Sequence, residues 1–254
     1  PLALWVEGRQ PTLLASAQLA IVGSRSPTTD GRETAEQFAR YLAERGLTIT
    51  SGLATGIDGA SHRGAVAALG GTVAVLGSGL DMIFPREHAS LAAEIVQRGL
   101  LVSEYAPGVE AQKLFFPQRN RIIAGLTLGT LVVEATRRSG SLITARLALD
   151  YGREVFAIPG SIHNPLARGC HYLIRQGAKL VDRQCVLSRP RPDVEQGRDV
   201  SGGNRADAHG GAVGLRGLAL EFACSPKRAR PAVTLRVLRG VRQQARSHLV
   251  EGSG

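Results

Sequence analysis

Short runs of apolar residues alternate with amphipathic segments along the first 187 residues of the chain. The apolar runs are LAIVG, LTITSG, GTVAVLG, LLVSE, TLVVEA and EVFAIPG, and a last short run extends from Ala178 to Val181. Near-continuous apolar runs are typical of strands that are buried on both faces of a sheet. The segments between them have the spacing of helices of about 10 to 15 residues. This alternation predicts an α/β fold: an extended Rossmann-like, doubly wound and mostly parallel sheet with flanking helices.

The amphipathic segments place helices at residues 33–45, 57–70, 89–98, 139–152 and 172–176. A further helix is expected to begin at Pro117, because the first N–H of a helix has no acceptor within the helix and proline loses nothing by lacking it. Near the N-terminus, the segment LALWVEG is expected to form a short strand.

The segment KLFFPQRNRIIAGL, from Lys113 to Leu126, combines aromatic and cationic side chains at the start of the helix that begins at Pro117. Arg119 and Arg121 would lie in its first turns, close to the positive end of the helix dipole. An anionic partner would relieve this conflict, and phosphate is the usual one at a helix N-terminus. Since aromatic rings stack on bases, the segment predicts a site for a nucleotide or a single-stranded nucleic acid.

The individual roles within this segment have alternatives. Adjacent rings point in different directions, so we expect one of Phe115 and Phe116 to lie in the core and the other to be exposed, and we favour Phe116 as the stacking ring. Arg119 and Arg121 either brace the helix or contact DNA, and the sequence favours neither reading.

The loops that follow the predicted strands are small, rich in glycine and often contain serine. They include Gly23-Ser24-Arg25, residues 51–56, residues 77–79, residues 134–141 and Pro159-Gly160. Ligands of doubly wound sheets bind at the carboxyl ends of the strands, where such loops let backbone N–H groups approach phosphates. Arg25 and Lys113 would add full positive charges there. For Arg25 the alternative is a salt bridge to a neighbouring carboxylate, and we favour the phosphate contact.

Motifs for other chemistry are missing from the sequence. It has no GxGxxG motif with a ribose-binding acid and no GxxxxGK[ST] motif, so it predicts neither a nicotinamide cofactor nor a P-loop. The cysteines, Cys170, Cys185 and Cys224, form no CxxC pair, which predicts a reduced, cytoplasmic protein without a zinc site. We therefore expect no cofactor, no metal and no catalytic residue.

Two acidic residues have both a structural and a catalytic reading. Asp58 and His62, spaced i and i+4, are expected to form a local helix pair rather than a catalytic couple. Glu134 follows a predicted strand and is the residue that a catalytic role would need, but capping of loop N–H groups is the alternative.

Charge is concentrated towards the C-terminus. Residues 188–254 hold 12 Arg and Lys against 6 Asp and Glu, so +6 of the net charge of +10 lies there. The part of the chain before residue 188 is mildly basic, which is compatible with nucleic acid binding. No run of about 18 apolar residues predicts a membrane span, and no signal segment is found. The chain begins with Pro1, which suggests that a natural N-terminal segment is missing.

The motifs SGLATGIDGASHRGA, AVLGSGLD, FFPQRNRIIAGL, VVEATRRSGSLITA and VFAIPG occur in the order seen in the DprA/Smf family, which the chain resembles from about Leu2 to Val186. The resemblance implies a Rossmann-like domain at residues 1–187 that binds single-stranded DNA and forms a homodimer. It also implies that the protein protects incoming DNA during natural transformation and loads the RecA recombinase while displacing single-strand-binding protein, without being an enzyme.

The resemblance also carries over to individual residues. The family's arginine after the first strand resembles Arg25, and its lysine and aromatic residue before the RNR motif resemble Lys113 and Phe116. With the neighbouring loops, the candidates for DNA binding are Ser24, Arg25, Gly52, Lys113, Phe116, Arg119, Asn120, Arg121, Ser139, Gly140 and Ser141.

Two segments of family members are not recognisable in this chain. These are an N-terminal helical domain and a C-terminal winged helix. Residues 188–254 show little apolar periodicity, and the chain holds 28 Arg against 3 Lys, as expected from a GC-rich gene. We hypothesise that this basic tail is disordered or translated out of frame.

Two other functions are alternatives to DNA binding. A nucleotide phosphoribohydrolase of related fold would use Glu134 as its acidic group, but the PGGxGTxxE motif of those enzymes is missing. A purely structural or protein-recruiting module would leave the arginines beside Pro117 without an anionic partner.

Overall fold

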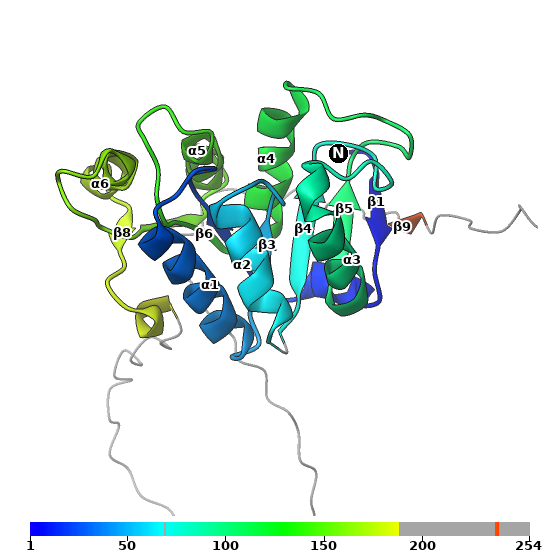
Figure 1. Cartoon of the computed structure of the whole chain (residues 1–254), viewed down its shortest axis with the longest axis horizontal. Coiled ribbons are helices and arrows are strands. Elements are labelled where there is room, and N and C mark those ends of the chain that lie inside the picture. Colours follow the sequence, from blue (N-terminus) through cyan, green and yellow to red (C-terminus); the bar gives the residue numbers. More distant parts are fainter. Residues whose placement is uncertain (69, 188–236, 239–254) are drawn as a thin grey trace, which may run out of the picture.

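The computed structural model describes residues 1–68, 70–187 and 237–238. They form a mixed sheet with the strand order β8-β7-β6-β2-β3-β4-β5-β1-β9 (Figure 1). The strands are β1 (Leu4–Glu7), β2 (Gln18–Val22), β3 (Thr48–Ser51), β4 (Thr72–Leu76), β5 (Leu100–Ser103), β6 (Gly129–Val132), β7 (Glu154–Ala157), β8 (Lys179–Leu180) and β9 (Val237–Leu238). Neighbouring strands are parallel except for β1, which pairs antiparallel with β5. The predicted mostly parallel α/β sheet is confirmed.

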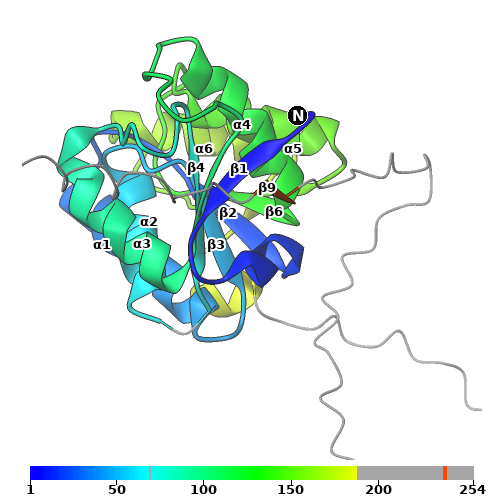
Figure 2. The ribbon, with the colours of Figure 1, turned by 90° about the vertical axis from the view of Figure 1, so that its right-hand side faces the viewer.

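Helices cover both faces of the sheet. They are α1 (Thr29–Ala43), α2 (Ile57–Val66), α3 (Ala89–Arg98), α4 (Phe115–Leu126), α5 (Ser141–Asp150) and α6 (Arg168–Arg175), with short 3-10 turns at η1 (Pro11–Ala15), η2 (Arg86–His88), η3 (Pro165–Ala167) and η4 (Gln184–Leu187). Figure 2 shows α1, α2 and α3 on one side of the strands and α4 and α5 on the other.

Alternate residues of the central strand β2 enter the two layers of the core. Leu19 and Ile21 pack in a cluster with residues of α1 and α2. Ala20 and Val22 pack in another cluster with residues of α4, α5 and α6. A strand buried in this way on both faces needs an uninterrupted apolar run, which explains why the apolar runs predicted the strands well.

The direction of winding changes between β2 and β6. From β2 the sheet grows through β3, β4 and β5 in one direction, and through β6, β7 and β8 in the other. Val22 and Val132 lie opposite each other in the two neighbouring strands. The loops that follow β2 and β6 therefore leave the same edge side by side, at the switch point where doubly wound sheets bind ligands.

Some predicted helix boundaries are wrong. Helix α1 begins at Thr29 rather than at residue 33, because the Thr28 side chain accepts a hydrogen bond from Gly31 N–H and caps the helix. Helix α4 begins at Phe115 rather than at Pro117. Pro117 still lies within the first turn, where an N–H group has no acceptor in the helix.

Three further helices differ from the prediction at their ends. Helix α2 ends at Val66 rather than at residue 70. Helix α5 runs over Ser141–Asp150 instead of 139–152, and α6 over Arg168–Arg175 instead of 172–176.

No helix among the described residues is both long enough and apolar enough to cross a membrane. The prediction for the tail, residues 188–254, lies outside the described residues apart from β9.

Candidate nucleic-acid interface

Aromatic and cationic side chains meet at the edge of the sheet where the parallel strands end. Phe116, in the first turn of α4, lies with its ring centroid 5.4 Å from that of Phe84, which comes from the loop between β4 and α3. The guanidinium carbon of Arg25, in the loop after β2, lies 5.5 Å from the Phe116 centroid. Lys113 is exposed on the segment that leads into α4. We call Arg25, Phe84, Lys113 and Phe116 the aromatic–cationic surface.

The expected division of Phe115 and Phe116 into one core ring and one exposed ring is wrong. Both residues are half-buried. Phe115 stacks on Tyr105 with centroids 4.1 Å apart and planes inclined by 22°, whereas Phe116 packs towards Phe84 and Gly77. Each ring therefore rests on a different loop at the same edge of the sheet.

The two cations of the aromatic–cationic surface are not engaged by carboxylates. Arg25 and Lys113 are exposed, and neither forms an ion pair with any described residue. The salt bridge considered as the alternative for Arg25 is therefore not found within the described part of the chain. Both charges are available to an anionic ligand.

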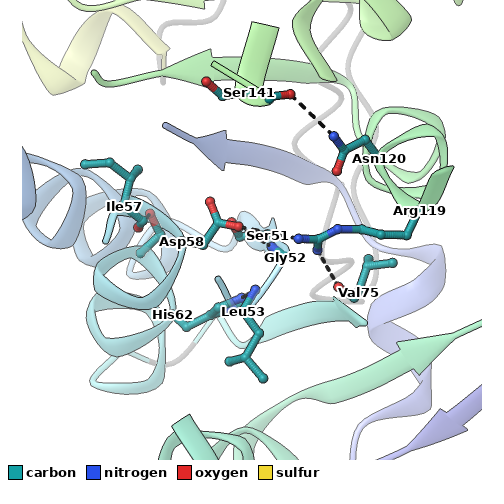
Figure 3. A network of polar contacts seen from close by, with 12 residues as sticks. Ser51, Gly52, Leu53, Ile57, Asp58, His62, Val75, Arg119, Asn120 and Ser141 are labelled. Carbon is teal, nitrogen blue, oxygen red and sulfur yellow. Dashed lines mark hydrogen bonds and ion pairs between the residues drawn. The ribbon is translucent and has the colours of Figure 1, made fainter. Parts of the chain in front are cut away.

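The arginines of the RNR segment are engaged inside the protein. Arg119 is 4% exposed, and its Nη2 atom lies 3.8 Å from Asp58 Oδ2 while Nη1 donates to the Val75 carbonyl (Figure 3). Arg121 pairs with Glu104. Carboxylates of the chain itself thus provide the anionic partners that the helix start needs. A bound phosphate is therefore not needed to offset the charges of these two arginines, and the geometry favours the bracing reading.

Burial dominates the electrostatics of the Arg119–Asp58 pair. Loss of solvent lowers the pKa of Arg119 to about 10, the Asp58 carboxylate opposes this shift, and the nearby Arg25 adds to it. Burial likewise raises the pKa of Asp58, which Arg119 and hydrogen bonds from the 51–54 segment partly offset.

Gly52 lies against the guanidinium group of Arg119. An ideal Cβ atom at this position would be 1.8 Å from Arg119 Nη1, so no larger residue fits without moving Arg119. Gly52 is buried, and its N–H donates to Asp58 Oδ2 at 3.2 Å. Because Gly52 has no side chain, Arg119 of α4 can pack against the turn after β3.

Two histidines hold the next residue of that turn. Leu53 has a positive φ of 57°, which is uncommon for a residue with a side chain. Its N–H donates to His62 Nε2 at 3.3 Å, and its carbonyl accepts from His88 Nδ1 at 2.9 Å. Asp58 and His62 therefore both bind the turn, and the expected pairing of one with the other is wrong.

The hydrogen bonds of His62 define its protonation. The Thr72 hydroxyl donates to the Ile49 carbonyl, so it accepts from Nδ1–H of His62, and Nε2 must be unprotonated to accept from Leu53. The ring is neutral, and burial lowers the pKa of His62 to about 3. Its place in the core indicates a structural role.

The loop before α5 joins α4 through its backbone. The Asn120 amide donates to the Gly140 carbonyl at 3.4 Å (Figure 3). The hydroxyl groups of Ser139 and Ser141 lie 2.7 Å apart and share a hydrogen bond. Ser24, in the loop after β2, accepts a hydrogen bond from the N–H of Ser26.

Glu134 caps the start of α1. Its carboxylate accepts hydrogen bonds from the Thr28 N–H at 2.9 Å and from the Thr28 hydroxyl at 2.8 Å, and the Asn164 amide lies within 3.4 Å. The negative charge also faces the positive end of the α1 dipole. The geometry therefore favours the capping alternative for Glu134.

Exposure divides the predicted site residues into three groups. Arg25, Lys113 and Gly140 are exposed; Ser24, Phe116, Arg121 and Ser139 are half-buried; Gly52, Arg119, Asn120 and Ser141 are buried. Two aromatic residues at this edge were not predicted from the sequence: Phe84, which is 49% exposed, and Tyr105. A single aromatic residue in a predicted loop gives little signal of its own.

The sequence and the structure both match known proteins. The sequence profile of DNA recombination-mediator protein A matches residues 1–188. The chain is 55% identical to Protein Smf from Escherichia coli (strain K12) over 182 residues, which are 71% of this chain and 48% of that protein. It is 48% identical to DNA processing protein DprA from Streptococcus pneumoniae over 181 residues, which are 71% of this chain and 64% of that protein. The chain thus spans about half to two thirds of these curated relatives.

Two solved structures share the fold at clear sequence identity. The X-ray structure of DprA from Streptococcus pneumoniae superposes with a TM-score of 0.69 at 47% identity, covering 73% of this chain and 65% of that one. DNA processing protein A from Helicobacter pylori, described for its single-stranded DNA binding mode, superposes with a TM-score of 0.67 at 30% identity, covering 72% of this chain and 84% of that one. The chain belongs to the DNA recombination-mediator protein A family, also known as DprA/Smf.

Proposed function

We propose that this chain binds single-stranded DNA at the carboxyl edge of its sheet and acts as a recombination mediator without catalysing a reaction. The observation that carries the proposal is the aromatic–cationic surface. There, Arg25 lies near the Phe116 ring, which contacts Phe84, and neither Arg25 nor the exposed Lys113 forms an ion pair within the described part of the chain. Phosphates bind such cations and bases stack on such rings, so one strand can use both.

The relatives support this reading. The Helicobacter pylori protein, which shares the fold at 30% identity, is described as binding single-stranded DNA. By the same family relationship, the proposal includes a homodimer that protects incoming DNA during transformation and loads a RecA-type recombinase in the cytoplasm.

The buried candidates take indirect roles in this proposal. Gly52, Arg119 and Asn120 connect α4 to the turn after β3 and to the loop before α5. They therefore position the loops and α4, while a strand contacts Arg25, Lys113 and the rings. In this proposal Ser24, Arg121 and Ser139, which are half-buried, and Gly140, which is exposed, contact phosphates at the margin of the interface.

The capping contacts of Glu134 support a non-enzymatic role. Both of its oxygens accept hydrogen bonds from Thr28, so the carboxylate is committed to the start of α1. A phosphoribohydrolase would need this group free to act on a nucleotide. Incubation with nucleoside monophosphates is expected to release no free base, and release that Glu134→Gln abolishes would favour the enzyme.

Comparison of single-stranded with duplex DNA tests the binding proposal. Fluorescence anisotropy with a labelled oligo(dT) and a duplex of equal length, each at two salt concentrations, is expected to show tighter binding of the single strand. Both affinities should fall with salt, because phosphate contacts release counterions. Equal affinity for both ligands would contradict a surface that uses stacking on unpaired bases.

A further inference from the structure

We propose that a base of the bound strand stacks on Phe84, the outermost ring of the interface. Phe116 packs against Phe84 and supports it. The inference rests on the proposed function and assigns a subsite within it. Phe84 is the one exposed phenylalanine among the described residues. It comes from a different loop than the segment 113–121 from which the sequence predicted the site.

Phe116 has little free ring surface. An ideal Cβ atom at Gly77 would lie 3.1 Å from Phe116 Cδ1, so the backbone of the β4–α3 loop covers part of the ring. Phe84 contacts it with planes inclined by 45°, and Arg25 lies near it. A base that approaches Phe116 would have to displace one of these neighbours.

The two rings do not form a slot for a base. A base sandwiched between two rings needs about 7 Å between them, twice the contact distance of about 3.5 Å. The centroids of Phe84 and Phe116 are only 5.4 Å apart and the planes are tilted. Stacking is therefore expected on the outer side of Phe84, where 49% of the residue is open to solvent.

The loop that carries Phe84 is held in place by hydrogen bonds of the residues that precede the ring. The Ser78 hydroxyl donates to the Met82 carbonyl at 2.7 Å, and the Ser103 hydroxyl donates to the Ser78 carbonyl at 2.6 Å. The Asp81 carboxylate accepts from Gly108 N–H at 2.8 Å. A ring held in this way loses little conformational entropy when it binds, which favours a direct role in affinity.

Charge complementarity selects a nucleic acid strand as the occupant. An exposed ring alone has no special meaning, because scattered apolar residues are common on protein surfaces. Here Phe84 contacts Phe116, and Phe116 contacts Arg25, which has no ion pair with any residue that the structure describes. A strand whose phosphate meets Arg25 can place an adjacent base over Phe84.

Substitution of Phe84 tests the inference in the full chain. Phe84→Ala is expected to weaken binding of oligo(dT) by on the order of 5- to 150-fold, the range for loss of one stacked base. Phe84→Tyr keeps a ring and should bind like the unchanged protein. The matched control is Tyr151→Ala, which removes an aromatic residue that is 48% exposed. Tyr151 follows the C-terminal end of α5, opposite the end that begins at Ser141.

An abasic strand separates stacking from indirect effects. It keeps the phosphates, so Lys113→Ala should weaken its binding, whereas Phe84→Ala should leave it unchanged. Equal affinity of Phe84→Ala and the unchanged protein for oligo(dT) would overturn the inference. Equal losses on oligo(dT) and on the abasic strand would also overturn it, because the ring would then act through the fold. If the unchanged protein does not bind oligo(dT), the proposed function fails as well.

Discussion

Lys113 and Phe116 are expected to affect DNA binding through different interactions. A lysine that neutralises one phosphate contributes about 0.7 to the slope of log affinity against log salt for a single strand. Lys113→Ala should flatten the slope by about this amount, and Arg25→Ala should do the same. Phe116→Ala removes the ring that supports Phe84, so it should instead lower affinity by a similar factor at every salt concentration, up to the loss of on the order of 1 to 3 kcal/mol that follows removal of a stacking ring.

A salt titration of each variant, monitored by anisotropy, measures these slopes. Thermal melts followed by circular dichroism serve as the control, because Phe116 is half-buried and its loss also removes packing. If Phe115→Ala weakens binding while Phe116→Ala does not, the ring on Tyr105 is the one that bears on DNA. If neither ring nor Lys113 matters, DNA binds elsewhere.

Gly52→Ala is expected to destabilise the protein by about 1 to 3 kcal/mol, the usual cost of forcing extra volume into a packed site. The new methyl group would overlap the Arg119 guanidinium and separate it from Asp58. Urea denaturation measures the difference. Gly140→Ala is the matched control, because a Cβ atom there has no neighbour within 4 Å. Unchanged stability of Gly52→Ala would show that Arg119 has room to move.

The turn between β3 and α2 makes stability depend on pH. His62 has a pKa of about 3 in the folded protein against an ordinary 6.5, so the unfolded chain binds a proton more readily between these values. The contribution of neutral His62 to the free energy of unfolding is therefore fully present above pH 6.5. It decreases as the pH falls from 6.5 towards 3, by up to about 1.4 kcal/mol per pH unit. Asp58, whose pKa burial raises, offsets part of this loss at the acidic end.

Urea midpoints at several pH values between 7.5 and 4.5 measure the effect. His62→Gln is the control, because it removes the titrating ring while keeping a polar side chain. It should be less stable than the unchanged protein at pH 7.5 but lose less stability on acidification. Parallel pH profiles of the two proteins would show that another group controls the acid sensitivity.

The sequence predicted elements better than the contacts between them. Strands buried on both faces require apolar runs, so their positions could be predicted from local pattern alone. Helix α1 began earlier than predicted because the cap at Thr28 depends on one side-chain hydrogen bond, a weaker signal than apolar spacing. The Arg119–Asp58 pair could not be predicted, because the packing of the whole sheet decides which carboxylate meets Arg119.

The candidate site was also predicted only in part, because contacts between distant segments could not be predicted from the sequence. The segment 113–121 predicted an aromatic and cationic region, and the structure places Phe116 against Phe84 and near Arg25, with Lys113 exposed on the segment before α4. The same segment also contains Arg119, whose neighbours bury it. Phe84 lies more than 30 positions earlier, and only the fold brings it against Phe116.

Residues 188–254 are expected to be dispensable for folding and for single-strand binding. Every loop at the carboxyl edge precedes Val186, and the family profile matches residues 1–188. Removal of the tail also removes its charge of +6, so affinity should fall most at low salt and least at high salt. Circular dichroism and anisotropy of the truncated chain check both expectations.

Failure of the truncated chain to fold would show that the tail is a true domain and that the reading-frame hypothesis is wrong. Resequencing of the locus tests that hypothesis directly. An intact winged-helix sequence in another frame is expected, and its absence from all three frames would contradict the hypothesis.

The switch in winding direction between β2 and β6 also affects how the protein is made. These neighbouring strands pair Leu19 with Gly129, about 110 positions later in the chain. During synthesis, β2 to β5 leave the ribosome well before β6, so one edge of the central strand stays unpaired while translation continues. Pairings between distant residues are slow to form. Because α4 emerges after β2 to β5, the aromatic–cationic surface is completed only after most of the domain has been synthesised.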